Sequence, residues 1–220
     1  METYSRLARE GASGILSIHI ASSLSNIVNV ARLAVRQIEE VPVAVVDSGQ
    51  LSLGLGLLAL RAAQAAATGW ALDRVRDAVL AAMARTYSFA IPDTLEYLRR
   101  GGRISGLQSS LATWLQVKPL LTMHDGRMTL ERIRTRGRSI ARMLEHARVL
   151  QPLESVAVLH ARARDQAEAL REQVRRAFPS LGEILVGEVT PAIGAHVGPG
   201  ALGLVCISAS EEQLKEGERR

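Results

Sequence analysis

The sequence predicts an α/β protein of two lobes, the first with a partial parallel sheet and flanking helices, the second with a mainly antiparallel sheet and helices. Early in the chain, short apolar runs at 14–20 and 41–46 alternate with segments of helical period. The second run is continuously apolar, which is typical of a central parallel strand. Further on, Asp125-Gly126 lies between two strand-like runs and predicts a hairpin. We place the lobes at 1–115 and 116–220.

The first lobe continues from each strand into a helix. Ser25 is a candidate N-cap for a helix with an apolar stripe that includes Ile27, Val28 and Ala31. Alanine-rich and amphipathic patterns then predict helices over 52–68 and 72–87. A short helix follows Pro92 and ends at 99–102, where arginines precede glycines as they do at helix C-termini.

The second lobe begins with the hairpin strands 116–123 and 127–135. Helical and strand periods then alternate to the end of the chain. We expect helices over 139–150 and 164–178, and strands over 155–159, 182–189 and 202–208.

The composition excludes several classes of protein. With 47% apolar and 22% charged residues the chain is neither disordered nor a disulfide-stapled miniprotein, and one cysteine, Cys206, cannot form an internal disulfide. The net charge is +5, but aromatic residues make up only 3%, so we expect no nucleic-acid partner. The charge-free run 51–60 is too short to cross a bilayer, and the first residues lack a signal peptide. We expect a cytoplasmic protein with no membrane span.

Motifs for cofactors and metals are absent from the sequence. Gly54 and Gly56 imitate a dinucleotide fingerprint, but they follow the strand end by several residues, so we expect them to serve helix packing. The five histidines are isolated from one another and from Cys206, which gives no metal-ligand spacing. We therefore expect no cofactor and no metal.

A cluster of hydroxyls follows the first strand, in the segment 21–26. Serine hydroxyls and unpaired backbone N–H groups at a helix N-terminus favour an anion. The alternative, equally weighted, is that Ser25 only caps the helix. Asp47-Ser48 follows the second strand at the same sheet edge, where open α/β sheets bind ligands.

Two glycine-rich segments carry further candidates. Arg103 follows Gly101-Gly102 and could bind a carboxylate or phosphate, or lie in solvent at a helix end. His196 lies within 190–200, which we interpret as a loop whose glycines approach another segment closely. The alternative is a single satisfied histidine in a turn.

Several of these motifs together resemble the DegV family of bacterial fatty-acid-binding proteins. The matching segments occur in the family's order, from about residue 14 to 208. They are His19-Ile-Ala-Ser-Ser-Leu-Ser25, Val46-Asp-Ser48 with Ser52-x-Gly54-x-Gly56, Asp93-Thr-Leu-Glu-Tyr-Leu, Gly101-Gly-Arg-Ile-Ser105, Val117-Lys-Pro-Leu-Leu121, Asp125-Gly126 and Ile193-Gly-x-His-x-Gly-Pro-Gly200.

The resemblance implies a carrier, not itself an enzyme. A long-chain fatty acid would be buried between two α/β lobes, and its carboxylate would be offered to a separate ATP-dependent fatty acid kinase subunit, with the acyl phosphate feeding phospholipid synthesis. The hydroxyls of Ser22, Ser23 and Ser25 would then hold the carboxylate. Arg103, Arg136 and His196 match family positions near the head group or facing the kinase.

The sequence departs from the family pattern in two places. Asn26-Ile27 replaces the usual Gly-Thr after the serines, and the family's opening strand with its Asp-Ser-Thr loop has no counterpart before residue 14. We expect part of the first lobe to be missing. Two alternatives therefore stay open: a truncated paralogue that acts as an oligomerising interaction module, and a small-molecule phosphotransfer protein of dihydroxyacetone-kinase type.

Overall fold

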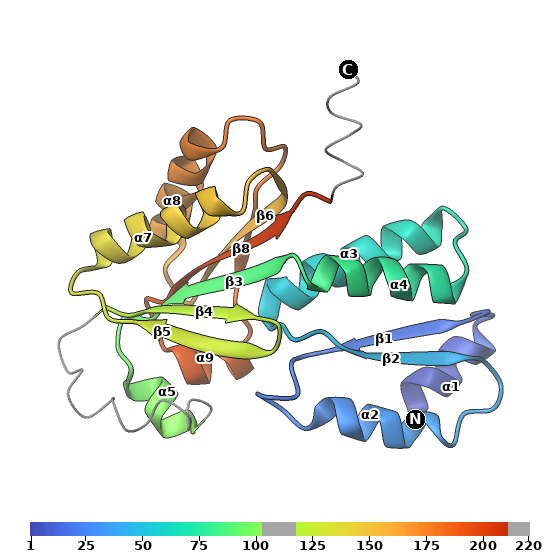
Figure 1. Cartoon of the computed structure of the whole chain (residues 1–220). Helices are drawn as coiled ribbons and strands as arrows, with labels where there is room; N and C mark the ends of the chain where they lie inside the picture. Colours follow the sequence, from blue (N-terminus) through green and yellow to red (C-terminus); the bar gives the residue numbers. More distant parts are fainter. Residues whose placement is uncertain (103–117, 211–220) are drawn as a thin grey trace. The chain divides into compact units, whose positions relative to one another are not determined.

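A computed structural model describes residues 1–102 and 118–210 of the chain (Figure 1). They form a mixed α/β structure with a small parallel sheet and a larger mixed sheet, which confirms the predicted fold class. The chain divides into two compact units. One comprises Met1–Ala84 with Asp125–Arg127, and the other comprises the described parts of Arg85–His124 and Met128–Arg220.

The first unit is built on two parallel strands, β1 (Ile15–His19) and β2 (Val43–Asp47), which pair along their whole length so that His19 lies opposite Asp47. Side chains of a strand alternate between the two faces of the sheet. The predicted strands at 14–20 and 41–46 are confirmed, and their parallel pairing places both carboxyl ends at one edge.

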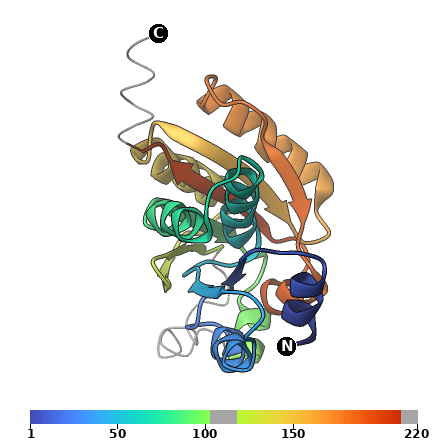
Figure 2. The same cartoon turned by 90° about the vertical axis from the view of Figure 1, so that its right-hand side faces the viewer.

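Helices cover both faces of this small sheet (Figures 1 and 2). On one face, Leu16, Ile18 and Val46 pack against α3 and α4; on the other, Ile15 and Val43 pack against α1 and α2. The helix bounds are α1 Glu2–Arg9, α2 Ile27–Val35, α3 Ser52–Ala67 and α4 Leu72–Met83. Gly54 and Gly56 lie inside α3, where a dinucleotide fingerprint has no function.

The second unit contains a six-stranded sheet in the order β5-β4-β3-β8-β6-β7, antiparallel except for the β6–β7 pair. The predicted hairpin is confirmed as β4 and β5, and Asp125 and Gly126 have the positive φ angles, 48° and 70°, that its turn requires. The strand bounds are β3 Thr86–Ile91, β4 Leu120–His124, β5 Arg127–Glu131, β6 Leu153–His160, β7 Leu185–Glu188 and β8 Leu202–Ser208.

One face of this larger sheet carries the main core. Phe89, Val158 and Leu204 of the central strands pack there with Met143 of α7 and Leu170 of α8. On the opposite face, Leu121 of β4 packs with Leu95 and Leu98 at the start of α5. The helix bounds are α5 Glu96–Gly101, α7 Arg136–Val149, α8 Arg164–Ala177 and α9 Pro191–Val197.

The predicted helix over 72–87 is wrong at its end, because α4 stops at Met83 and Thr86–Ile91 forms β3. Tyr87, Phe89 and Ile91 alternate toward the main core, which is the period of a strand. Since β3 pairs with β4 and β8, the two units divide at residues 84 and 85 instead of the expected 115 and 116.

Candidate functional site

The serine turn, residues 21–26, connects the end of β1 to the start of α2. Ser22 and Ser23 are exposed and Ser25 is half-buried. The backbone N–H groups of Leu24 and Ser25 both donate to Ala21 O, which closes the turn. The helix starts one residue later than predicted: Asn26 is the N-cap, while Ser25 Oγ accepts a 3.4 Å hydrogen bond from Ile27 N.

Asp47, at the end of β2, ties this turn to the neighbouring strand. Both of its carboxylate oxygens lie 3.2 Å from Ser22 N, and Oδ1 also accepts from Gly49 N at 3.1 Å. Burial raises the pKa of Asp47, but the hydrogen bonds from Ser22 and Gly49 and the charge of Arg32 outweigh it, so the net pKa is lowered. Asp47 is therefore an ionised anchor of the turn.

Donors remain for a ligand at the serine turn. Among the described residues, the backbone N–H groups of Ser23 and Asn26 and the Ser23 hydroxyl have no hydrogen-bond partner. They lie just beyond the carboxyl end of β1, where open α/β sheets bind ligands, and at the N-terminus of α2. The N-terminus of a helix carries the positive end of its dipole. Such a set of donors can bind a carboxylate or another small anion.

A chain of side-chain hydrogen bonds on the α1 face of β1 was not foreseen from the sequence. Tyr4 Oη lies 2.6 Å from Ser17 Oγ, which lies 2.8 Å from His19 Nε2. Burial lowers the pKa of His19, and the charge of Asp47 opposes that shift. The i, i+2 spacing of Ser17 and His19 places both side chains on one face of a strand, so this pair could have been predicted from the sequence. Tyr4 could not, because it comes from α1, a helix that the sequence analysis did not predict.

His196 lies on α9 and not in a loop, so the interpretation of 190–200 as a loop is wrong. Pro191 opens the helix, as proline does at the first helical position, and Gly198 ends it with φ 74°. The expected close approach does occur. A Cβ added at Gly198 would lie less than 3.0 Å from three Tyr97 ring atoms, and one added at Gly101 less than 3.0 Å from His196 Nδ1.

These two contacts interlock α5 with α9, and we refer to them as the α5–α9 clasp. His196 Nδ1 is buried and has no hydrogen-bond partner among the described residues. Gly101 stands two positions before Arg103 in the sequence, and Arg103 itself lies outside the described residues.

Arg136 begins α7 and contacts the segment that follows α9. Its Nη2 donates to Gly200 O at 2.6 Å, and its Nη1 lies 3.5 Å from Asp93 Oδ1. Burial lowers the pKa of Arg136, and the charge of Asp93 opposes that shift. Arg136 and His196 thus flank the same turn, 198–200, in the second unit, while the three serines belong to the first unit.

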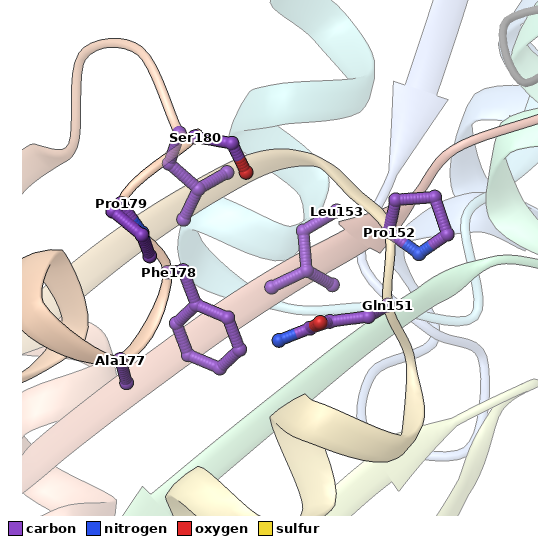
Figure 3. A pocket seen from close by; sticks show the side chains of 8 residues that line it. Gln151, Pro152, Leu153, Ala177, Phe178, Pro179 and Ser180 are labelled. Carbon is purple, nitrogen blue, oxygen red and sulfur yellow. The ribbon is translucent and has the colours of Figure 1, made fainter. Parts of the chain in front are cut away.

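A pocket in the second unit is too small for a long-chain ligand. Figure 3 shows the side chains around it, which come from the segment that leads into β6 with the first residue of that strand, and from the last residue of α8 with the loop that follows it. Its volume is about 110 Å³, whereas ligand pockets typically measure about 300–1,000 Å³. The lining residues are Gln151, Pro152, Leu153, Ala177, Phe178, Pro179, Ser180 and Leu181.

Within residues 1–102 and 118–210, no three His, Cys, Asp or Glu side chains come together as metal ligands do. In the same part of the chain, no helix has both the length and the apolar character needed to cross a membrane.

An α/β protein of two units, with a hydroxyl-rich turn at the carboxyl end of a parallel strand, has well-defined relatives. The family model described as an uncharacterised protein of the DegV family matches residues 1–209, and the chain belongs to this family. The predicted resemblance is therefore confirmed. A DegV domain-containing protein of Streptomyces coelicolor is 43% identical over 210 residues, which cover 94% of this chain and 74% of that protein.

Solved structures agree with this assignment. A DegV family protein from Corynebacterium glutamicum superposes with a TM-score of 0.88 at 27% identity, covering 95% of this chain and 81% of that one. A Thermus thermophilus DegV family protein, described by its fatty acid binding, gives 0.85 at 32% identity, with coverage of 94% and 76%. DegV of Bacillus subtilis, described as a fatty acid binding protein, gives 0.83 at 28% identity, with coverage of 94% and 75%.

Proposed function

We propose that this chain is a cytoplasmic lipid carrier that binds a long-chain fatty acid and presents its carboxylate to a separate ATP-dependent kinase subunit. The observation that carries the proposal is the set of unpaired donors in the serine turn, in a chain whose relatives from Thermus thermophilus and Bacillus subtilis are described as fatty acid binding. In this proposal Ser22, Ser23 and Ser25 bind the carboxylate.

The energetics of an acyl ligand explain why such donors are needed. A palmitate tail has about 14 methylenes, and burying each contributes about 0.8 kcal/mol, or roughly 11 kcal/mol in total. Losses of translational and side-chain freedom on binding remove several kcal/mol of that gain. An unpaired buried carboxylate would cancel most of what is left. Hydroxyl and backbone N–H donors pair with the carboxylate without placing a permanent cation beside the tail.

Residues of the second unit serve the transfer step in this proposal. Arg103, Arg136 and His196 stabilise negative charge as phosphate reaches the carboxylate, and they act as electrostatic partners and not as nucleophiles. The chain itself then catalyses no reaction, and the acyl phosphate passes to phospholipid synthesis.

The binding part of the proposal is tested on the protein alone. Mass spectrometry of the denatured protein should detect a co-purified fatty acid, and the delipidated protein should bind added palmitate. Ser23→Ala and Ser25→Ala should each weaken palmitate binding by about 1–3 kcal/mol, the value of a hydrogen bond to a charged group. The exposed Ser180, in the second unit, provides the matched control, and Ser180→Ala should leave the affinity unchanged. A lipid-free protein that fails to bind palmitate would refute the proposal.

The transfer part requires the kinase subunit of the source organism. With that subunit and ATP, His196→Ala and Arg136→Met should retain palmitate binding and reduce acyl phosphate formation. Equal loss of binding and phosphorylation in both variants would show that these residues bind the lipid instead.

One observation favours a second candidate, an oligomerising interaction module. Ile27, Val30 and Leu33 form a stripe on α2 and are 44%, 53% and 58% exposed. Ile27 therefore does not share the face of Val28 and Ala31, which are buried, as the predicted stripe had it. Large apolar side chains gathered on one exposed face often mark an interaction surface. Sedimentation equilibrium of the lipid-free protein distinguishes the candidates, because only the module requires a mass that rises with concentration.

A further inference from the structure

Three charged side chains from distant parts of the sequence meet in the second unit. Asp93 follows β3, Lys118 precedes β4 and Arg136 begins α7. Lys118 Nζ lies 2.6 Å from Asp93 Oδ1 and 2.7 Å from Asp93 O, and Arg136 Nη1 lies 3.5 Å from the same Oδ1. Two cations therefore converge on a single carboxylate oxygen.

The charges of this cluster do not balance. Two positive groups share one carboxylate, and the shorter hydrogen bond of Arg136, 2.6 Å, goes to the neutral carbonyl of Gly200. The Arg136 side chain is only 24% exposed, and burial lowers its pKa, so solvent compensates its charge poorly. The cluster thus carries a net positive charge in a partly desolvated place, which favours a further anion.

The two cations are held in position, whereas the carboxylate is not. The buried Ser139 Oγ fixes the main chain of Lys118 by donating to Lys118 O at 2.5 Å. Lys118 Nζ also donates to the backbone carbonyl of Asp93, and Arg136 Nη2 donates to Gly200 O, so both cations keep one bond that does not involve the carboxylate. The Asp93 side chain is 52% exposed, so it can turn toward solvent and leave both cations in place. Lys118 and Arg136 would then offer N–H donors to the oxygens of an incoming group.

We propose that Lys118 and Arg136 form a binding site for a phosphoryl group, and that the Asp93 carboxylate occupies this site until a phosphoryl oxygen displaces it. This inference rests on the proposed function and adds to it a place for the phosphate that the kinase reaction brings. An acyl phosphate and the terminal phosphate of a nucleotide share this chemistry.

The test is a titration of the isotope-labelled full chain with inorganic phosphate, acetyl phosphate and ATP at constant ionic strength. The amide signals of Gly198 and Gly200 report occupancy by NMR. Asp93→Asn keeps the size of the side chain and removes its charge, so it should bind phosphate about fivefold tighter or more. Lys118→Met and Arg136→Met should bind it about tenfold weaker or worse. Preference for acetyl phosphate indicates the acyl phosphate as the source, and preference for ATP indicates the nucleotide.

Arg142→Met is the matched control. Arg142 lies on the same helix α7, pairs with Glu131 and Glu145, and takes no part in the cluster. This variant should bind phosphate as the parent does. The proposal is overturned if Asp93→Asn does not tighten binding, or if Arg142→Met weakens it as much as Arg136→Met does. If the Lys118→Met variant does not fold, the phosphate affinity of Asp93→Asn by itself tests the proposal. Palmitate binding without phosphate binding would refute this site and leave the proposed carrier function intact.

Discussion

The α5–α9 clasp predicts a large and specific effect of one methyl group. In Gly198→Ala the new Cβ would lie less than 3.0 Å from three ring atoms of Tyr97, and the backbone at φ 74° and ψ 165° is in a region that almost only glycine occupies. The backbone strain costs about 1–3 kcal/mol, and overpacking costs about 1–3 kcal/mol more. Tyr97 is only half-buried and can move to relieve part of the overlap. We therefore take the lower ends of both ranges and expect the free energy of unfolding to fall by at least about 2 kcal/mol.

Thermal unfolding followed by circular dichroism measures this loss. For a chain of this size, 1 kcal/mol corresponds to about 2–4 °C, so the midpoint of Gly198→Ala should fall by at least about 4 °C. Gly137→Ala, in α7, is the control, because its added Cβ meets no atom within 4 Å and alanine favours a helix. Adding Tyr97→Ala to Gly198→Ala should recover about 1 kcal/mol relative to the sum of the single variants. Equal stability of Gly198→Ala and Gly137→Ala, or strict additivity with Tyr97→Ala, would refute the clasp.

Three further predictions concern other parts of the chain. The lowered pKa of Asp47 means that its ionised form stabilises the fold above its ordinary pKa of about 3.9, and that this contribution is lost as the pH falls through the lowered pKa. Urea unfolding should therefore show that Asp47→Asn is less stable than the parent at pH 7 and that the difference shrinks as the pH falls through that lowered pKa. A difference that does not depend on pH would contradict this prediction. Ser139→Ala should lower the free energy of unfolding by about 1–2 kcal/mol, because Lys118 O loses a buried hydrogen-bond donor. An unchanged free energy of unfolding in urea would contradict that hydrogen bond. Burial raises the pKa of Cys206 to about 12, so a thiol reagent should label it only as the protein unfolds, and rapid labelling of the native protein at pH 8 would contradict the buried position.

Short sequence patterns predicted much of the fold, because neighbouring residues are enough to determine a buried strand or a tight turn. The continuous apolar run at 41–46 became β2, and the Asp125-Gly126 turn became the β4–β5 hairpin, since few other residue pairs adopt its two positive φ angles. The strand β3 was missed because the apolar residues of α4 run almost directly into it, and a helical period continues to fit for several residues. Because β3 pairs with β4 and β8, it belongs to the second unit, and the boundary between the units therefore lies before β3 and not after residue 115.

The candidate site was predicted in parts. The serine turn follows from a strand, a hydroxyl cluster and a helix in direct succession, which a sequence shows. The anchoring of Ser22 by Asp47, 25 residues away, depends on the pairing of β1 with β2. The helix α9 was missed because two of its neighbours are glycines at positive φ, and the packing of His196 on Gly101 joins residues 95 positions apart. No periodicity reveals such contacts.

The central claim is that the serine turn receives the carboxylate of a fatty acid, and carbon-13 NMR of carboxyl-labelled palmitate tests it most directly. The delipidated protein should give a single bound carboxyl resonance at one equivalent of ligand. That resonance should shift in Ser23→Ala and Ser25→Ala and stay in place in Ser180→Ala. A bound signal that none of the serine variants moves, or no bound signal at all, would contradict the account.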